Sequence, residues 1–118
     1  MSNEAVLVID DDIPTRVSLK MFLEFEGFVV NSCESGAAAL DLISKKCFDI
    51  LLIGYSVPEM NGDELTRRLR PLCPDAFILG FSAESKDQEF LSAGANAFVR
   101  KDRLVHELVQ LIKNRMQI

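Results

Sequence analysis

Five short apolar runs alternate with five segments of helical character along the chain, and this alternation constrains the fold more than any other feature. The apolar runs cover residues 6–9, 28–30, 50–53, 77–79 and 97–99, and the helical segments cover residues 14–26, 35–46, 62–70, 85–93 and 104–115. Continuous apolar runs of this length are typical of strands that are covered on both faces. The alternation therefore predicts an α/β fold, in which a doubly wound, five-stranded parallel sheet carries five helices on its two faces.

Residues that begin and end helices stand at the expected boundaries. Asp12 and Pro14 suit the start of the first helix, because aspartate caps helix N-termini and proline fits the first turn. Gly27 and Gly94 suit the ends of the first and fourth helices. Pro71 is expected to end the third helix, because proline disfavours helical geometry in the residue before it.

Length, charge and cysteine content exclude several classes of protein. A chain of 118 residues suits a single domain, so residues 1–118 are expected to form one unit. The net charge of −5 disfavours direct nucleic-acid binding, which needs clustered Lys and Arg. No apolar run is long enough to span a bilayer and no secretory signal is recognised, so we expect a cytoplasmic protein without a membrane partner. The three cysteines are expected to be free thiols.

In a doubly wound sheet, ligands gather at the carboxyl ends of the strands. This rule identifies the candidate functional residues before any family is considered. They are Asp10, Asp11 and Asp12 after the first strand, residues 54–56 after the third, Ser82 after the fourth, and Lys101 after the fifth.

The motifs at these positions resemble those of bacterial response-regulator receiver domains, which belong to two-component signalling. VLVIDDD resembles the first strand with its paired acids, and LLIGYSVPEMNG resembles the strand and loop that carry the phosphorylated aspartate. GFSA resembles the end of the fourth strand, and AGANAFVRK resembles the fifth. The resemblance covers essentially the whole chain and implies a flavodoxin-like sheet with strand order 2-1-3-4-5.

The resemblance also implies a role for each residue of the phosphate pocket. In the family, two acids of the first strand and the acceptor aspartate hold Mg²⁺, helped by a main-chain carbonyl in the loop. The ion and a lysine neutralise the charge of the phosphoryl group. A hydroxyl and an aromatic residue form the switch. The corresponding residues here are Asp10, Asp11 and the Ser56 carbonyl for the metal, with Ser82 as the hydroxyl, Phe98 as the aromatic residue and Lys101 as the cation.

Simpler roles remain open for the same residues. The acids at 10–12 also suit a helix N-terminus, where negative charge is favoured by the helix dipole. Ser82 also suits a cap of the fourth helix, and Phe98 suits plain core packing. His106, which has no ligand-like neighbours in the sequence, is expected at the surface.

Gly54 stands where the family has its phosphoacceptor aspartate. Glycine offers no nucleophile and removes one metal ligand, so a Mg²⁺ site here is expected to be weak or unoccupied, and no other cofactor is implied. Tyr55 is expected to point to the opposite face of the strand. Ser56 is no substitute, because an alcohol forms a stable ester rather than a labile acyl phosphate.

Two further departures lie near the fifth strand. The family usually has a proline after the pocket lysine, joined by a cis peptide bond, whereas this chain has Asp102. A cis bond before a residue other than proline costs ~2.5–4 kcal/mol, so we predict a trans Lys101–Asp102 bond and a shifted loop. The fourth helix is expected to be short, which argues against the dimer that phosphorylation drives in the family.

The first helix carries two apolar stripes. The stripe that is expected to face the core is formed by Leu19, Phe22 and Leu23. Val17, Met21 and Phe25 form another stripe at four-residue spacing on a different side. Single exposed apolar residues are ordinary, but three on one stripe favour an interaction face for a partner or for a second copy of the chain.

The sequence thus favours a pseudo-receiver, which is a non-enzymatic interaction module that acts without phosphorylation. Its expected partners are signalling proteins: a histidine kinase, an output domain, another regulator or a second copy in a homodimer. The alternative is an ordinary phosphoryl-accepting receiver in which Gly54 is an engineered substitution. An enzyme or small-molecule binder is disfavoured, because no Gly-rich phosphate loop, nucleophile–base pair or metal-spaced His or Cys set is found.

Overall fold

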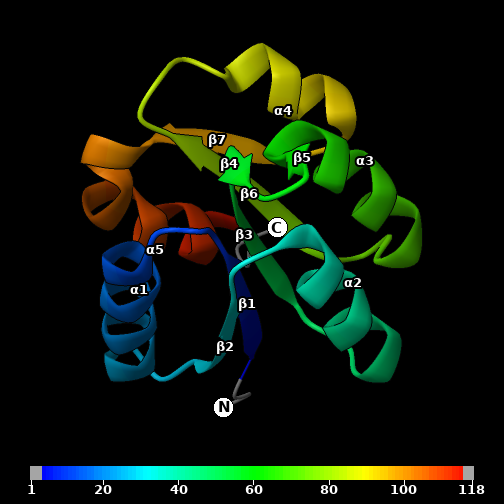
Figure 1. Ribbon diagram of the computed structural model, residues 1–118. Helices are drawn as coiled ribbons and strands as arrows, with labels where there is room; N and C mark the ends of the chain where they lie inside the picture. The colour runs from blue at the N-terminus through cyan, green and yellow to red at the C-terminus, as the bar shows by residue number, and fades with distance from the viewer. Residues whose placement is uncertain (1–3, 116–118) are drawn as a thin grey trace.

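The computed structural model, which describes residues 4–115, is an α/β sandwich around a parallel sheet (Figure 1). The sheet has the strand order β2-β1-β3-β6-β7, and all four pairings are parallel. Numbered along the chain without the short hairpin described below, this is the order 2-1-3-4-5, so the predicted fold is confirmed. The strands of the sheet are β1 (Ala5–Ile9), β2 (Val29–Cys33), β3 (Ile50–Gly54), β6 (Phe77–Ser82) and β7 (Ala97–Arg100).

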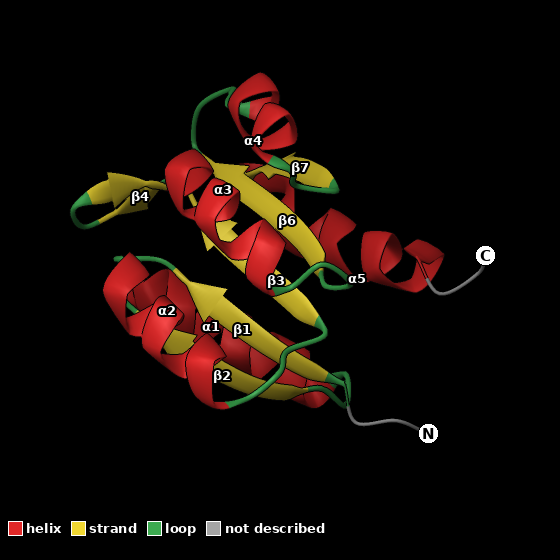
Figure 2. Ribbon diagram, turned by 90° about the vertical axis from the view of Figure 1, so that its right-hand side faces the viewer, coloured by secondary structure: helices red, strands yellow, loops and turns green. Residues whose placement is uncertain are grey.

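Five helices cover the two faces of the sheet, as the doubly wound prediction requires. In Figure 2, α2 and α3 lie across the face of the sheet that is turned toward the viewer, while α1 and α5 lie behind it. Each face has its own cluster of buried apolar side chains. The helices are α1 (Ile13–Phe25), α2 (Gly36–Lys45), α3 (Gly62–Leu72), α4 (Asp87–Ala93) and α5 (Leu104–Arg115).

Three residues that were predicted to begin or end helices do so in the structure. Asp12 caps α1, and its carboxylate accepts a hydrogen bond from the Thr15 N–H at 3.0 Å. Ser35 caps α2 in the same way. Gly94 ends α4 with a φ of 112°, a left-handed conformation that glycine adopts at little cost.

The predicted end of the third helix is wrong. Helix α3 continues through Pro71 to Leu72. A proline in the last turn of a helix removes only one backbone hydrogen bond. The Arg70 side chain adds hydrogen bonds to the segment that follows the helix. Its guanidinium donates to the carbonyls of Cys73 and Ala76 at 3.2 and 2.9 Å.

A short hairpin, which the sequence analysis did not predict, follows β3. Strands β4 (Ser56–Val57) and β5 (Met60–Asn61) pair antiparallel across a two-residue turn. Glu59 in this turn has a φ of 74°.

The helix expected at residues 85–93 begins only at Asp87, so α4 has seven residues. The three cysteines are free thiols, as predicted. Within residues 4–115, no helix is long and apolar enough to cross a bilayer.

Phe90 anchors this short α4 helix to the sheet. Its side chain is fully buried, and its ring occupies the space above two glycines. A Cβ atom on Gly80 of β6 would lie 2.6 Å from Phe90 Cδ2, and one on Gly62 would lie 2.8 Å from Phe90 Cζ. Real Cβ atoms do not approach other heavy atoms this closely. The Phe90 ring can therefore lie here because residues 62 and 80 are glycines.

Replacing Phe90 with alanine should therefore lower the free energy of unfolding by about 3–5 kcal/mol. Removal of the ring leaves a cavity, and Gly62 and Gly80 have no side chains that could fill it. Chemical denaturation followed by circular dichroism measures this change. Leu91→Ala is the matched control, since Leu91 is the next residue of α4 and is 49% exposed. Its cost should stay within about 0.5 kcal/mol. Equal costs for the two variants would contradict the anchoring role of Phe90.

Candidate functional site

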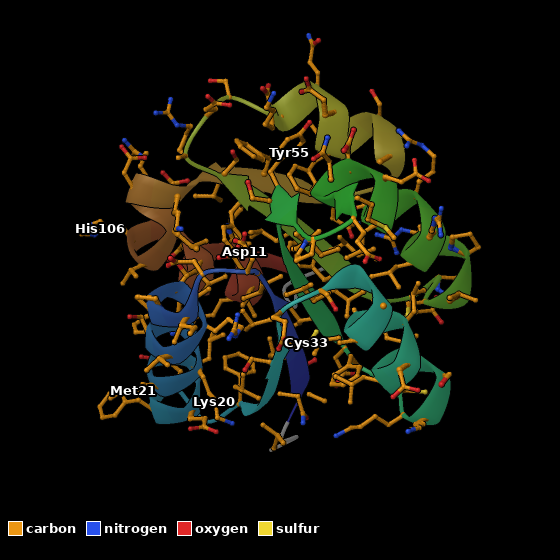
Figure 3. The ribbon with its side chains drawn as sticks, viewed as in Figure 1. Asp11, Lys20, Met21, Cys33, Tyr55 and His106 are labelled. Atoms are coloured by element: carbon orange, nitrogen blue, oxygen red, sulfur yellow. The ribbon has the colours of Figure 1, made fainter. Side chains whose placement is uncertain are left out.

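An open cavity of about 460 Å³ lies at the carboxyl ends of the strands. Polar residues from the ends of β1, β3, β6 and β7 meet there, as the sequence analysis expected. In Figure 3, Asp11 and Tyr55 mark this edge of the sheet. Phe98, by contrast, is not part of the lining. The cavity is lined by Asp10, Asp11, Asp12, Tyr55, Ser56, Phe81, Ser82, Ala83, Glu84 and Lys101.

The Asp10 carboxylate occupies the space beside Gly54. A Cβ atom on Gly54 would lie 2.9 Å from Asp10 Cγ and closer still to Asp10 Oδ1. Asp10 is only 4% exposed, and its Oδ2 accepts a hydrogen bond from the Asp12 N–H at 3.3 Å. The side chain of any other residue at position 54 would therefore begin where the carboxylate now lies. A side chain at position 54 would thus require the Asp10 carboxylate to turn aside, and we call this close approach the interlock of Gly54 and Asp10.

Burial of Asp10 changes its acidity. Removal from water raises the pKa of Asp10 from 3.8 to about 6, and the positive charge of Lys101 opposes this rise only in part. The ammonium of Lys101 lies near Asp12, with 3.9 Å between Lys101 Nζ and Asp12 Oδ2. Hydrogen bonds from Thr15 lower the pKa of Asp12, so this carboxylate is held in its charged form.

Asp12 therefore has a structural role in capping α1, which agrees with the simpler role left open for the acids at 10–12. Its Oδ2 accepts hydrogen bonds from both the N–H and the hydroxyl of Thr15, at 3.0 and 2.6 Å. Asp11 is exposed at the cavity. Of the three acids, only Asp10 is directed into the space at Gly54.

The Ser82 hydroxyl lies at the cavity but makes a local contact. It accepts a hydrogen bond from the Glu84 N–H at 3.1 Å, within the loop that follows β6. The alternative role of Ser82 as a cap of the fourth helix is wrong, because α4 begins at Asp87 and the residue at its cap is Lys86. The loop between them separates Ser82 from the helix.

An aromatic cluster lies beside the cavity, and the sequence analysis missed it. Phe98 stacks on Phe90 with 5.8 Å between ring centroids, and Tyr55 meets Phe90 edge to face at 6.2 Å. The Lys86 ammonium lies 4.7 Å from the centre of the Tyr55 ring. Tyr55 thus points toward α4 and not into the place of residue 54. The only signal in the sequence was the pair of glycines that admit Phe90, and these lie far apart along the chain.

The acids at the cavity are not grouped around a common position for Mg²⁺ in this arrangement. Magnesium is bound in octahedral geometry by one or two carboxylates, and water molecules supply most of the other ligands. Asp10, the central acid of the expected set, is turned toward Gly54 and is engaged by the Asp12 N–H. Asp11 and Ser56 are exposed at the rim. Among residues 4–115, no three His, Cys, Asp or Glu side chains are grouped so that they could hold a metal ion.

Three other predicted features concern a peptide bond, a histidine and the stripe on α1. The Lys101–Asp102 peptide bond is trans, as predicted, since the described residues contain no cis bond. His106 is exposed on α5 and points away from the body of the molecule (Figure 3). The stripe on α1 is exposed as expected, with exposed fractions of 50% for Val17, 67% for Met21 and 87% for Phe25.

Comparison with known proteins identifies the family. The family model for the response regulator receiver domain matches residues 6–113. This chain belongs to the response regulator receiver domain family. Among curated relatives, the response regulators MprA of Mycobacterium sp. (strain KMS) and Mycobacterium avium are each 35% identical over 107 residues, which is 88% of this chain. The chain spans about half the length of these relatives, at 46% and 47%.

Solved receiver structures have the same fold. A CheY-like receiver domain protein from Methanospirillum hungatei is 28% identical, with a TM-score of 0.91 and coverage of 98% of this chain and 95% of the other. A response regulator from Thermotoga maritima, solved in complex with Mg(2+)-BeF, is also 28% identical, with a TM-score of 0.86 and coverage of 94% and 97%. Receiver domains are signalling modules, and the family as a whole interacts with histidine kinases, output domains or other regulators.

The interlock of Gly54 and Asp10 predicts a steric coupling. Gly54→Ala should lower the free energy of unfolding by about 1–3 kcal/mol, because its methyl group forces the Asp10 carboxylate out of place. In an Asp10→Ala background the same change should cost much less, and the double-mutant cycle gives the coupling. Gly36→Ala is the control, since its Cβ would meet the ends of the Met60 and Leu65 side chains at 3.3 and 3.4 Å, which are less severe contacts. Additive effects at positions 10 and 54 would contradict the interlock.

The raised pKa of Asp10 predicts how stability depends on pH. The folded protein holds this proton more tightly than the unfolded chain, so stability falls as the pH rises from about 4 to about 6 and stays lowered above that. Asp10→Asn removes the buried charge but keeps the shape of the side chain. It should be more stable than the parent by up to about 3 kcal/mol near neutral pH, at about 1.4 kcal/mol per pKa unit.

Denaturant titrations at a series of pH values measure this difference. The advantage of Asp10→Asn should shrink below pH 6 and vanish below about pH 3, where the carboxyl group is neutral in both states. A difference that is constant across this range would show that Asp10 titrates normally.

Proposed function

We propose that this chain is a pseudo-receiver, a receiver domain that regulates other signalling proteins without accepting a phosphoryl group. It acts as an interaction module rather than an enzyme and needs no Mg²⁺. Residues 1–118 serve as one receiver-like unit in this proposal. The partner is a histidine kinase, an output domain or another regulator, and the exposed stripe on α1, formed by Val17, Met21 and Phe25, is the surface for contact.

The interlock of Gly54 and Asp10 carries this proposal. The position that corresponds to the phosphoacceptor has no carboxylate of its own, and the neighbouring Asp10 carboxylate fills the space where the acceptor's side chain would begin. Asp10 does not replace the nucleophile, since it is 4% exposed and has a pKa raised to about 6.

The charge of the cavity supports the same conclusion. Asp10, Asp11, Asp12 and Glu84 bring four carboxyl groups to the lining, against the single ammonium of Lys101. That ammonium lies 3.9 Å from the Asp12 carboxylate, which offsets its charge. A phosphoryl group would therefore enter a site of the same sign as its own charge, without a metal ion to compensate.

The residue at the place of the family's switch aromatic is held by packing. Phe98 stacks on Phe90, which is itself fully buried above Gly62 and Gly80. Motion of Phe98 would require this stack to open, and the cavity contains no phosphorylated residue to favour the change. The surface formed by α4 and β7 is thus expected to keep one conformation, so that regulation depends on which partner binds.

A second candidate is an ordinary phosphoryl-accepting receiver in which Gly54 is an engineered substitution. The observation that favours it is the placement of Ser82 and Lys101, which line the cavity together with Asp10 and Asp11 at the ends of the strands. Under this alternative, Asp10 has moved into the space that the lost side chain left. The natural gene decides between the two at once, by the residue that it encodes at position 54.

Labelling with acetyl phosphate in the presence of Mg²⁺ tests the proposal on the protein itself. We expect no acid-labile, hydroxylamine-sensitive phosphorylation of the parent chain, with a receiver that retains its aspartate as the positive control. The proposal also expects Gly54→Asp to stay unlabelled, because Asp10 obstructs the new side chain. Labelling of the parent would overturn the proposal, and efficient labelling of Gly54→Asp alone would favour the engineered alternative.

A further inference from the structure

We propose that Cys47 and Cys73 form a reversible disulfide bond, which makes this domain responsive to the thiol redox state of its surroundings. Both residues line a cavity of about 270 Å³ at the amino-terminal ends of β3 and β6. This is the edge of the sheet opposite the larger cavity at Gly54. The proposed pseudo-receiver role makes no use of either thiol.

The parallel pairing of β3 with β6 brings the two cysteines together, although they lie far apart along the chain. Ile50 pairs with Phe77 at the start of these strands, and the Phe77 N–H donates to the Asp49 carbonyl at 2.9 Å. Cys47 lies between α2 and β3, and Cys73 is the capping residue at the end of α3. Figure 2 shows α2 and α3 on the same face of the sheet. The segments that lead into β3 and β6 therefore run side by side.

An electrostatic interaction also indicates that the two thiols are close. The pKa of Cys73 is raised, first by burial and then by the negative charge of the Cys47 thiolate, while the positive charge of Arg70 opposes the rise. Such an effect between side chains near the surface falls off quickly with distance. Cys47 is exposed, whereas Cys73 is partly buried. A small oxidant in solution thus reaches Cys47 first.

Redox chemistry suits this pair better than metal binding does. Within the described part of the chain, residues 4–115, no three His, Cys, Asp or Glu side chains are grouped so that they could hold a metal ion. In a reducing compartment, such as the cytoplasm expected for this chain, disulfides are usually transient and serve catalysis or redox sensing. The pair has the features of a sensor, with one accessible thiol beside a second that can resolve it.

The third cysteine, Cys33, provides an internal reference. It is 7% exposed in the core of the domain, and its thiol contacts the Ser35 carbonyl at 3.8 Å. Burial raises the pKa of Cys33 to about 11, so little thiolate forms there at neutral pH. Because the thiolate is the reactive form, Cys33 is expected to stay reduced while the other two cysteines react.

A peroxide is the oxidant in this proposal. The Cys47 thiolate attacks one oxygen of hydrogen peroxide, the O–O bond breaks, and Cys47 becomes a sulfenic acid as water leaves. The Cys73 thiolate then attacks the Cys47 sulfur, the S–O bond breaks, and the S–S bond forms as a second water leaves. The two thiols lose two electrons and two protons in total, and the peroxide is reduced to water. The first step also removes the Cys47 charge that opposes ionisation of Cys73.

The bond would join the turn after α2 to a segment that is already held in place. Arg70 donates to the carbonyls of Cys73 and Ala76 at 3.2 and 2.9 Å. The same guanidinium donates to the Gly94 carbonyl at 2.9 Å and to Asn96 Oδ1 at 2.6 Å. A disulfide would extend this network to the turn before β3 and restrain the turn.

The inference goes beyond the proposed function and does not rest on it. Phosphoryl labelling reports on the cavity at Gly54, whereas thiol counting reports on the opposite edge of the sheet. A chain that accepts phosphate but forms the disulfide would remove the pseudo-receiver and leave this inference intact.

Thiol counting on the native full-length chain is the direct test. The protein is treated with a slight excess of hydrogen peroxide, then denatured and alkylated, and its intact mass is measured. The reduced protein should take up three alkyl groups, one for each free cysteine, and the oxidised protein only one. Peptide mapping should place the bond between Cys47 and Cys73 and the alkyl group on Cys33. Dithiothreitol should restore all three thiols.

Single substitutions supply the controls. Cys47→Ser and Cys73→Ser should each abolish the intramolecular bond, whereas Cys33→Ala should still form it, and circular dichroism confirms that each variant is folded. Hydrogen exchange gives a structural readout. Amides of residues 46–49 should exchange several-fold more slowly in the oxidised form, because the bond restrains the turn. Amides of the β4–β5 hairpin, at the opposite edge of the sheet, should be unchanged.

Three results would overturn the inference. The first is oxidation that stops at Cys47, without loss of the Cys73 thiol. The second is a disulfide between two copies of the chain, which non-reducing electrophoresis detects. The third is a bond that includes Cys33.

Discussion

The close approach of the Asp10 carboxylate to Gly54 is the constraint on which the functional interpretation depends. A glycine at the end of β3 removes a side chain, and the neighbouring acid at the end of β1 fills the space. The carboxylate loses water in doing so, which raises its pKa to about 6. In the proposed pseudo-receiver, this arrangement leaves no place for a phosphoryl group at position 54. The central acid of the pocket is buried and accepts a hydrogen bond from the Asp12 N–H.

The packing of the aromatic cluster beside the cavity is a second constraint. Phe90 is fully buried where Gly62 and Gly80 provide space, and Phe98 stacks against it. The position that corresponds to the family's mobile aromatic residue is thus part of a packed core. The packed aromatic cluster and the exposed apolar stripe on α1 are the two features that support the proposed interaction role.

The sequence predicted the parts of the structure that depend on local patterns. Buried runs such as residues 50–53 can be recognised because both faces of their strand are apolar, and Asp12 and Gly94 have conformational preferences that mark helix ends. The β4–β5 hairpin was not predicted, because two-residue strands are too short to show a periodicity. The place of Phe90 depends on two glycines that meet only in the folded chain, and the orientation of Asp10 depends on space left by Gly54. Neither effect is visible in a pattern of neighbouring residues.

The central claim is that this pocket does not adopt the phosphorylated state of a receiver. It is tested most directly by backbone NMR spectra recorded while Mg²⁺ and beryllofluoride, the combination bound in the Thermotoga maritima relative, are added to the parent chain. The account predicts that the amide signals of Gly54, Ser82 and Phe98 stay in place throughout the titration. Saturable shifts of these signals, which spread to α4 and β7, would contradict it.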